Sequence, residues 1–167
     1  VQAFFHLTKT LDPTRPIIGN DGWESTATDV IGIHDYDCNP LTLRERYGPF
    51  VKPEELFDRR RPGGRILTLD GYPHRGQPIV LSKFGGIAYT ERETPAQTTW
   101  GYIKIKDGLE FEQTFAALLE VVRTTTMFTG FCYTQFTDTF QEANGLLYAD
   151  RTPKLPIETI ARAIRGQ

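Results

Sequence analysis

The sequence predicts an α/β fold with a parallel sheet, and two observations carry this prediction. First, short runs of aliphatic and β-branched residues alternate with amphipathic, helix-like segments along the chain. Second, several of these runs end in polar residues, as buried parallel strands do when their carboxyl ends open into a site. The clearest run is residues 78–86 (PIVLSKFGG), in which Ser82 and Lys83 follow the apolar part. We therefore expect a site at the carboxyl edge of the sheet, as in a (β/α) barrel or a doubly wound fold.

The bulk properties are those of one ordinary globular domain. Of the 167 residues, 39% are hydrophobic and 24% are charged, and the formal net charge is −2. This balance argues against a disordered tail and against a polyanion binder, so we expect no nucleic-acid partner. No apolar run approaches the roughly 20 residues needed to span a bilayer, so we expect no membrane partner. Val1 begins in mid-pattern without an initiator Met, and we expect a piece of a longer chain.

The cysteines and glycines exclude several kinds of site. Cys38 and Cys132 are too few for a disulfide framework or a metal cluster, so we expect no metal, and Cys132 is interpreted as a small core residue. The chain contains neither G-x-G-x-x-G nor G-x-x-x-x-G-K-[ST], which argues against nucleotide binding. We expect no cofactor. The sequence indicates no cellular compartment.

The periodicity of apolar residues predicts the elements in chain order. Strands are expected at residues 15–21, 29–34, 65–70, 78–86 and 129–135, and helices at 3–11, 41–47, 53–60, after Asp107, and at 156–164. Asp107 and Glu110 have capping-box spacing, and Gly166 ends the last helix. Residues 59–61 (RRR) are interpreted as a solvated surface run rather than an anion grip, and residues 87–106 as a long irregular connection.

Three of these helices have apolar residues at helical spacing. These positions are Phe4, Leu7 and Leu11 in the first helix, Phe111, Phe115, Leu118, Leu119 and Val122 in the helix after Asp107, and Ile157, Ile160, Ala161 and Ile164 in the last. Each set lies on one face of its helix, and we expect the face of the last helix to point inward.

Four motifs resemble, in order, the second half of the catalytic domain of glycoside hydrolase family 2. They are residues 11–16 (LDPTRP), 29–36 (DVIGIHDY), 78–86 (PIVLSKFGG) and 130–146 (GFCYTQFTDTFQEANGL). The family includes β-galactosidases and β-glucuronidases, and the resemblance covers essentially the whole chain. It implies a (β/α)8 TIM barrel, of which residues 1–167 supply the second half, about four parallel strands with helices. It also implies a β-glycoside as the substrate.

The resemblance implies that Lys83 occupies the position of the catalytic nucleophile. Relatives carry Ser/Thr-Glu-Phe/Tyr-Gly at the end of the seventh strand, and residues 82–85 (SKFG) match everywhere except at the Glu. A protonated Lys has no lone pair for attack, and its charge repels an oxocarbenium ion. The acid/base Glu of the family lies upstream of this chain. The local carboxylates that are candidates for substitution are Asp21, Asp37, Asp138 and Glu142, and none has the nucleophile's position by motif.

Other site roles follow from the resemblance, each beside a structural alternative. Tyr36 matches the tyrosine that hydrogen-bonds the nucleophile, and Tyr133 an aromatic sugar platform, although either can be a structural residue. His34 is expected to contact a sugar hydroxyl or to be a satisfied structural His. The remaining candidates for substrate contact are Gln135, Asp138 and Glu142, which equally well pin the loop after the last strand, and Asp21, Trp23 and Trp100.

Three hypotheses remain open at the level of sequence. The chain is part of a glycosidase, or a sugar-binding pseudo-enzyme, or a structural half-barrel. An isolated half-barrel exposes two sheet edges and an apolar inner face, so we expect it to form a homo-oligomer or to need its missing amino-terminal half. The sequence does not indicate which sugar is recognised.

Overall fold

The computed structural model describes residues 1–91 and 99–166, which form two units. The first unit contains Val1–Asp35, Arg46–Lys83 and Thr126–Cys132, and the second contains Tyr36–Glu45, Phe84–Thr125 and Tyr133–Gln167. The units are treated separately below. In the part of the chain that the structure describes, no helix is long and apolar enough to cross a membrane.

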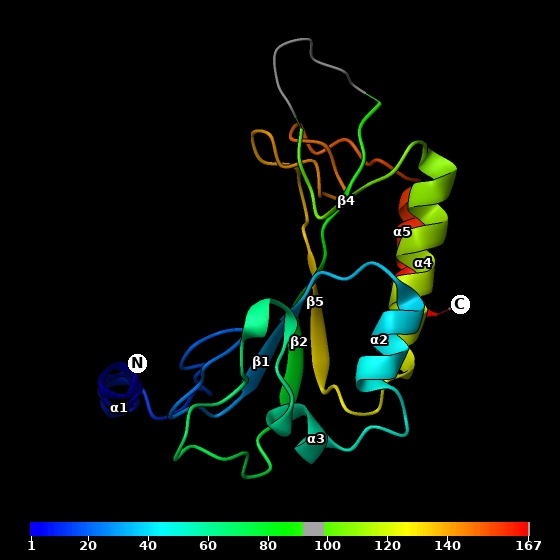
Figure 1. The fold of residues 1–167 in the computed structure, drawn as a ribbon. Coiled ribbons are helices and arrows are strands. Elements are labelled where there is room, and N and C mark those ends of the chain that lie inside the picture. Colours follow the sequence, from blue (N-terminus) through cyan, green and yellow to red (C-terminus); the bar gives the residue numbers. More distant parts are fainter. Residues whose placement is uncertain (92–98, 167) are drawn as a thin grey trace. The chain divides into compact units, whose positions relative to one another are not determined.

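A three-stranded sheet organises the first unit, in the order β1-β2-β5 (Figure 1). The strands are β1 (Ile31–Asp35), β2 (Ile79–Gly85) and β5 (Gly130–Thr134), and the last residues of β2 and β5 extend into the second unit. Hydrogen bonds join Thr129 to Ile79 where β5 and β2 begin, and Gly86 to Thr134 where they end, so these two strands run parallel. The aliphatic run at 78–81 therefore forms the central strand, as predicted.

The predicted strand at residues 15–21 is wrong. The chain there forms no strand, and side chains take the bonds that a neighbouring strand would take. The Ile17 N–H donates to the Asp29 carboxylate at 2.8 Å, and the Gly19 N–H donates to the Thr28 hydroxyl at 3.1 Å. Pro16 has no N–H to contribute to a ladder. The segment is therefore an irregular connection, and Thr28 and Asp29, which precede β1, hold it in place.

Two further expectations about strands change in detail. In place of a strand at residues 65–70, the structure has a single parallel bridge between Ser25 and Thr68. The connection at 87–106 is less irregular than predicted, because β3 (Ile87–Ala88) pairs in parallel with β4 (Ile103–Lys104). The rest of that prediction falls partly on residues 92–98, which lie outside the described residues.

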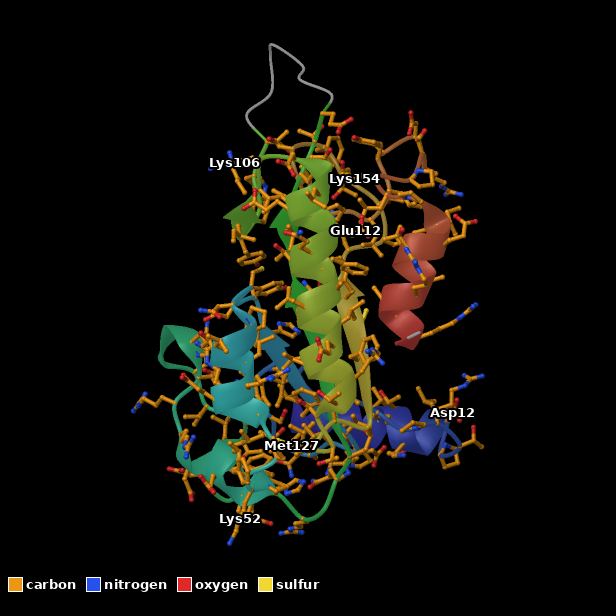
Figure 2. The ribbon with its side chains drawn as sticks, turned by 90° about the vertical axis from the view of Figure 1, so that its right-hand side faces the viewer. Asp12, Lys52, Lys106, Glu112, Met127 and Lys154 are labelled. Atoms are coloured by element: carbon orange, nitrogen blue, oxygen red, sulfur yellow. The ribbon has the colours of Figure 1, made fainter. Side chains whose placement is uncertain are left out.

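The short helices form where expected, but the first helix does not bury its apolar face. The helices are α1 (Gln2–Leu11), α2 (Pro40–Tyr47) and α3 (Pro53–Asp58), followed by a 3-10 turn, η1 (Pro62–Gly64). In α1, Phe4 and Leu11 are 74% and 77% exposed, and Leu7 is also exposed. The shared apolar face predicted for this helix is therefore exposed among the described residues. Figure 2 shows Asp12 at the end of this helix.

Two helices pack against each other in the second unit (Figures 1 and 2). The first is α4 (Gly108–Thr124), whose cap Asp107 accepts a hydrogen bond from the Glu110 N–H at 2.8 Å, as predicted. All five of its predicted core residues are buried. The second is α5 (Ile157–Arg165), in which Ile160 is buried but Ile157 and Ile164 are exposed, which contradicts the predicted face. Gly166 ends α5 at a φ of 77°, where a Cβ atom would overlap the Arg123 guanidinium.

A buried carboxylate at the end of β1 ties together separate segments of the first unit. Asp35 is 1% exposed, and its oxygens accept from Arg46 at 2.7 and 2.8 Å and from the Tyr47 hydroxyl at 2.7 Å. The Arg61 guanidinium lies 3.4 Å from the same carboxylate and 4.9 Å from the Tyr47 ring. Arg61 is buried, and this burial lowers its pKa. The predicted solvated run at 59–61 is thus wrong for its third residue.

The interpretation of Cys132 as a core residue is also wrong. β5 lies at an edge of the three-stranded sheet, and Cys132 and its neighbour Phe131 are both exposed there. The apolar character of the strand predicted burial, but no part of the chain that the structure describes covers Phe131 and Cys132.

We predict that the Asp35 network is a major source of stability in the first unit. Asp35→Ala leaves two arginines near each other, one of them buried, so we expect a loss of roughly 3–5 kcal/mol in the free energy of unfolding. Chemical denaturation monitored by circular dichroism measures this loss.

The matched control is Glu24→Ala, which removes an acid paired with Arg65 at 2.9 Å on a partly exposed site. We expect this variant to lose less than about 1 kcal/mol. Equal losses in the two variants would contradict the special role of Asp35.

Candidate functional site

The candidate site begins at the carboxyl end of the central strand β2. Lys83 is exposed there, and Ser82 precedes it with its hydroxyl turned toward the first unit's own loops. That hydroxyl donates to the Asp21 carboxylate at 2.5 Å and lies 3.3 Å from the Ile33 carbonyl oxygen. The end of β2 is thus linked by hydrogen bonds to β1 and to the loop that precedes it.

Asp21 gathers three of the predicted site residues in the first unit. Its second carboxylate oxygen lies 2.9 Å from His34 Nε2, and the Trp23 ring meets the His34 ring edge-on at 4.9 Å between centroids. Gly22 has a φ of 94°, and a Cβ atom there would lie 2.6 Å from the His34 ring. We call Asp21, Trp23, His34 and Ser82 the Asp21 cluster. The sequence named the first three as candidates but did not predict that the Asp21 carboxylate joins His34 to Ser82, with Trp23 held against the His34 ring.

The second unit brings together Tyr36 and Trp100 through a residue that the sequence analysis did not select. Tyr102 stacks on Tyr36 with 3.7 Å between ring centroids and 5° between planes, and Trp100 meets Tyr102 edge-on at 5.8 Å. Burial and a hydrogen bond with Tyr36 raise the pKa of Tyr102 to about 12. The signal that could have identified Tyr102 is its place in residues 100–102 (WGY), beside the already selected Trp100.

Tyr133 lies in a packed aromatic environment. Its ring meets Phe84 and Phe115 edge-on, at 5.5 and 5.0 Å between centroids, and burial raises the pKa of its phenol. Gly85 has a φ of 89°, and a Cβ atom there would lie 2.3 Å from the Tyr133 ring. The glycine after the Lys-Phe pair is therefore required both for backbone conformation and for space. A sugar contact by Tyr133 stays a prediction.

The remaining candidates lie in the loop after β5, and their observed contacts hold that loop. Asp138 accepts from the Gly145 N–H and from Lys154 Nζ, each at 2.8 Å. The Gln135 amide donates to the Thr139 hydroxyl at 3.4 Å, and the Glu142 backbone pairs with Thr139. The loop-pinning role left open by the sequence is thus observed for Asp138. Contact of these residues with a sugar stays a prediction.

Lys154 is the functional-looking residue that the sequence did not signal. Its ammonium group is buried and donates to Asp138 and to the carbonyl oxygens of Tyr89 and Ala143, at 2.6–2.8 Å. Burial lowers its pKa, whereas the Asp138 carboxylate opposes that shift. Figure 2 labels Lys154 among the loops of the second unit. Because all three of its donor directions are used within the protein, it organises the loop rather than a ligand.

The candidate site residues fall into two groups, one in each unit. Lys83 and the Asp21 cluster belong to the first unit, whereas Tyr36, Trp100, Tyr133 and the loop after β5 belong to the second. The role that the resemblance implies for Tyr36, beside the nucleophile position, therefore stays a prediction. Within residues 1–91 and 99–166, no cluster of three His, Cys, Asp or Glu side chains is arranged to hold a metal ion.

Comparison with known structures shows the fold that these groups are built on. The chain aligns with a family 2 β-galacturonidase from Eisenbergiella tayi, with TM-scores of 0.62 in its galacturonate-bound structure and 0.59 in its glycerol-bound structure. It also aligns with a β-D-glucuronidase from Dictyoglomus thermophilum at a TM-score of 0.54. In each case 18% of residues are identical and 98–99% of this chain is covered.

The chain spans less than a third of those proteins, 28–30% of their length. No protein-family profile matches the sequence. No curated protein matches it either. The comparisons therefore establish a mixed α/β fold with parallel strands that is shared with solved family 2 glycoside hydrolases.

We predict that Lys154 is essential to the loop after β5. Lys154→Met leaves the Asp138 carboxylate without its cation and removes the lysine donor from the Tyr89 and Ala143 carbonyl groups, of which Ala143 keeps the Tyr89 N–H, so we expect a loss of roughly 3–5 kcal/mol in unfolding free energy. Hydrogen exchange of the Gly145 amide reports the loop directly and should accelerate.

Lys106→Met is the matched control, because Lys106 is exposed (Figure 2). We expect it to change stability by no more than about 0.5 kcal/mol. Unchanged protection of the Gly145 amide in Lys154→Met would show that the loop does not depend on this lysine.

Proposed function

We propose that this chain is the carboxyl-terminal half of the catalytic (β/α)8 barrel of a family 2 β-glycosidase, with Lys83 at the nucleophile position. The observation that carries the proposal is the placement of residues 82–85 (SKFG), the family's nucleophile motif with one substitution, at the carboxyl end of the central strand of a parallel sheet. Parallel α/β folds carry their catalytic residues at this end of the strands. The shared fold of the galacturonidase and glucuronidase structures supports the same proposal.

The chemistry of retaining glycosidases makes the lysine decisive. Such enzymes need a nucleophilic carboxylate and an acid/base carboxyl group roughly 5–5.5 Å apart. In the proposed full-length protein, the acid/base lies in the amino-terminal half of the barrel. At Lys83 a protonated amine neither attacks the anomeric carbon nor stabilises the positive charge that develops there. We therefore propose that this chain with Lys83 does not catalyse glycoside hydrolysis.

Two of the four acids that are candidates to replace a nucleophilic Glu are already engaged in other hydrogen bonds. Asp21 uses one carboxylate oxygen for Ser82 and the other for His34. Asp138 is held by Lys154 and the Gly145 amide. A carboxylate that already accepts such hydrogen bonds is less able to attack a carbon atom than one aimed at the substrate, which supports the proposed inactivity.

The proposed ligand is a β-glycoside, and acidic sugars are the first to test. One structural neighbour holds galacturonate, and the others are a galacturonidase and a glucuronidase by their descriptions. An exposed ammonium group at the strand end also favours a sugar that carries a carboxylate. We propose β-galacturonides and β-glucuronides before neutral β-galactosides.

A second candidate function is a sugar-binding protein that has lost the chemistry. It is favoured by the exposed rings of Trp100 and Tyr102 in the second unit, since aromatic faces bind sugars without any catalytic group. The two candidates differ in the expected effect of Lys83→Glu, which restores turnover in a glycosidase but not in a sugar-binding protein. The third candidate, a structural half-barrel, differs from both in binding no sugar.

We predict that Lys83→Glu restores turnover in the full-length protein. The substitution places a carboxylate at the position where the family carries its nucleophile, so 4-nitrophenyl β-glycosides of galacturonate, glucuronate and galactose should release nitrophenol. The protein with Lys83 should show none above background. Turnover by both forms would contradict our interpretation of Lys83.

Lys83→Gln separates charge removal from nucleophile restoration, because it neutralises the amine without supplying a carboxylate. We expect this variant to stay inactive. If Lys83→Glu is also inactive but still binds the glycosides, the sugar-binding candidate is correct. If neither form binds a glycoside, the structural candidate is correct.

We further predict that the isolated chain self-associates. Phe4 and Leu11 on α1 and Phe131 on edge strand β5 are exposed, and a barrel half leaves such surfaces to be covered by its other half. Analytical ultracentrifugation over a range of concentrations should show dimers or larger species. A stable monomer at about 100 μM, a concentration at which weak apolar contacts associate, would contradict the half-barrel proposal.

A further inference from the structure

A pocket lies within the first unit, at the edge of the sheet opposite Lys83. Its volume is about 310 Å³, and its walls come from α1, from residues 26–28 before β1 and from residues 71–77 before β2. These segments precede the strands, whereas Lys83 lies at the end of β2. The run from Ile79 to Lys83 alone spans roughly 13 Å at the usual rise of a strand. The pocket is therefore separate from the candidate catalytic end.

The charge around this pocket is positive. None of its lining residues is an Asp or a Glu, whereas Arg75 and His6 both line it. Arg75 forms no ion pair with any residue that the structure describes, in contrast to Lys9 and Arg65, which hold Asp29 and Glu24. Because Lys9 lies 2.7 Å from Asp29, the carboxylate that follows the 26–28 segment is already neutralised. The pocket thus offers an uncompensated cation to an anionic ligand.

Two aromatic side chains give the pocket an apolar wall. Phe5 of α1 and Tyr72 both line it, and the Tyr72 ring is anchored by a hydrogen bond of 2.8 Å from its hydroxyl to the Gln2 side chain. The Phe5 ring is braced edge-on by His6 at 5.4 Å between centroids. Flat apolar walls of this kind pack against the face of a ring, in a sugar or an aromatic molecule.

The size of the pocket and one polar group without a hydrogen bond restrict the class of ligand further. An apolar cavity of roughly 150 Å³ accommodates benzene, so about 310 Å³ suits one six-membered ring with substituents. The Thr26 hydroxyl oxygen is buried in the pocket wall, and no described residue hydrogen-bonds to it. Rotation about its Cα–Cβ bond gives a bound ligand a hydrogen-bonding partner in addition to Arg75.

We propose that this pocket binds a small carboxylate carried on a six-membered ring, with Arg75 contacting the carboxylate and Phe5 and Tyr72 contacting the ring. The same chemistry occurs in aromatic acids and in acidic sugars. The proposal does not depend on the function of the Lys83 end, because none of the residues that carry it lies there.

Titrations followed by amide NMR spectra test the proposal and distinguish the two sources. The ligands are benzoate and glucuronate, with benzyl alcohol and glucose as uncharged counterparts and acetate as a carboxylate without a ring. We expect benzoate, glucuronate or both to shift the amides of Thr26 and Tyr72, and the other three to bind at least tenfold more weakly. Shifts confined to Ser82 and Gly85, or equal binding of acetate, would overturn the proposal.

Two arginine variants locate the charge. Arg75→Gln removes the pocket cation and should weaken carboxylate binding by roughly tenfold or more, since a charge-assisted hydrogen bond is lost. Arg60→Gln removes an exposed arginine of the same unit outside the pocket and should leave affinity unchanged. Both side chains are exposed, so unchanged thermal unfolding confirms that each variant folds. Equal weakening by the two variants would show non-specific attraction and overturn the proposal.

Discussion

The first unit depends on the burial of a single carboxylate, that of Asp35 at the end of β1. Arg46 and Tyr47 of α2 and Arg61, which precedes η1, all contact it. A buried charge is tolerated only when its partners satisfy it, so this carboxylate dictates where α2 ends and where the loop after α3 returns. The same strand that ends in Asp35 carries His34, one residue earlier, toward Asp21. The stability of the sheet and the placement of the Asp21 cluster therefore share one strand.

The carboxyl end of β2 combines a closely packed backbone with an exposed positive charge. Ser82 is tied to Asp21, and Gly85 and Gly86 adopt backbone conformations that leave room for Tyr133 and Tyr102. These features require particular residue types, and the chain has them. Lys83 between them is exposed, so its charge does not disturb the strand. In the function that we propose, it reverses the charge that glycosidase chemistry needs, and sugar binding and catalysis are then separable.

The sequence was sufficient where local pattern and burial agree. The aliphatic run of β2 was predicted because it is apolar enough to be a buried central strand, and α4 because a capped helix closes its own backbone hydrogen bonds and packs one continuous face. It failed where distant residues decide. Residues 15–21 have the pattern of a strand, but their backbone N–H groups donate to the side chains of Thr28 and Asp29. Arg61 has the sequence context of a surface residue, but it is buried because it pairs with the Asp35 carboxylate. No local pattern reveals a partner so far away along the chain. The apolar residues of α1 and β5 have the composition of a core, yet none of the described residues covers them.

The most direct test of the central claim is a crystal structure of the full-length protein with a bound β-galacturonide. Our account predicts that the sugar lies at the carboxyl end of β2, with Lys83 Nζ within about 4 Å of the anomeric carbon, near the separation of reacting atoms in a catalytic complex. A glycoside bound elsewhere, with Lys83 more than about 8 Å from the anomeric carbon, well beyond such contact, would contradict the assignment of Lys83 to the nucleophile position.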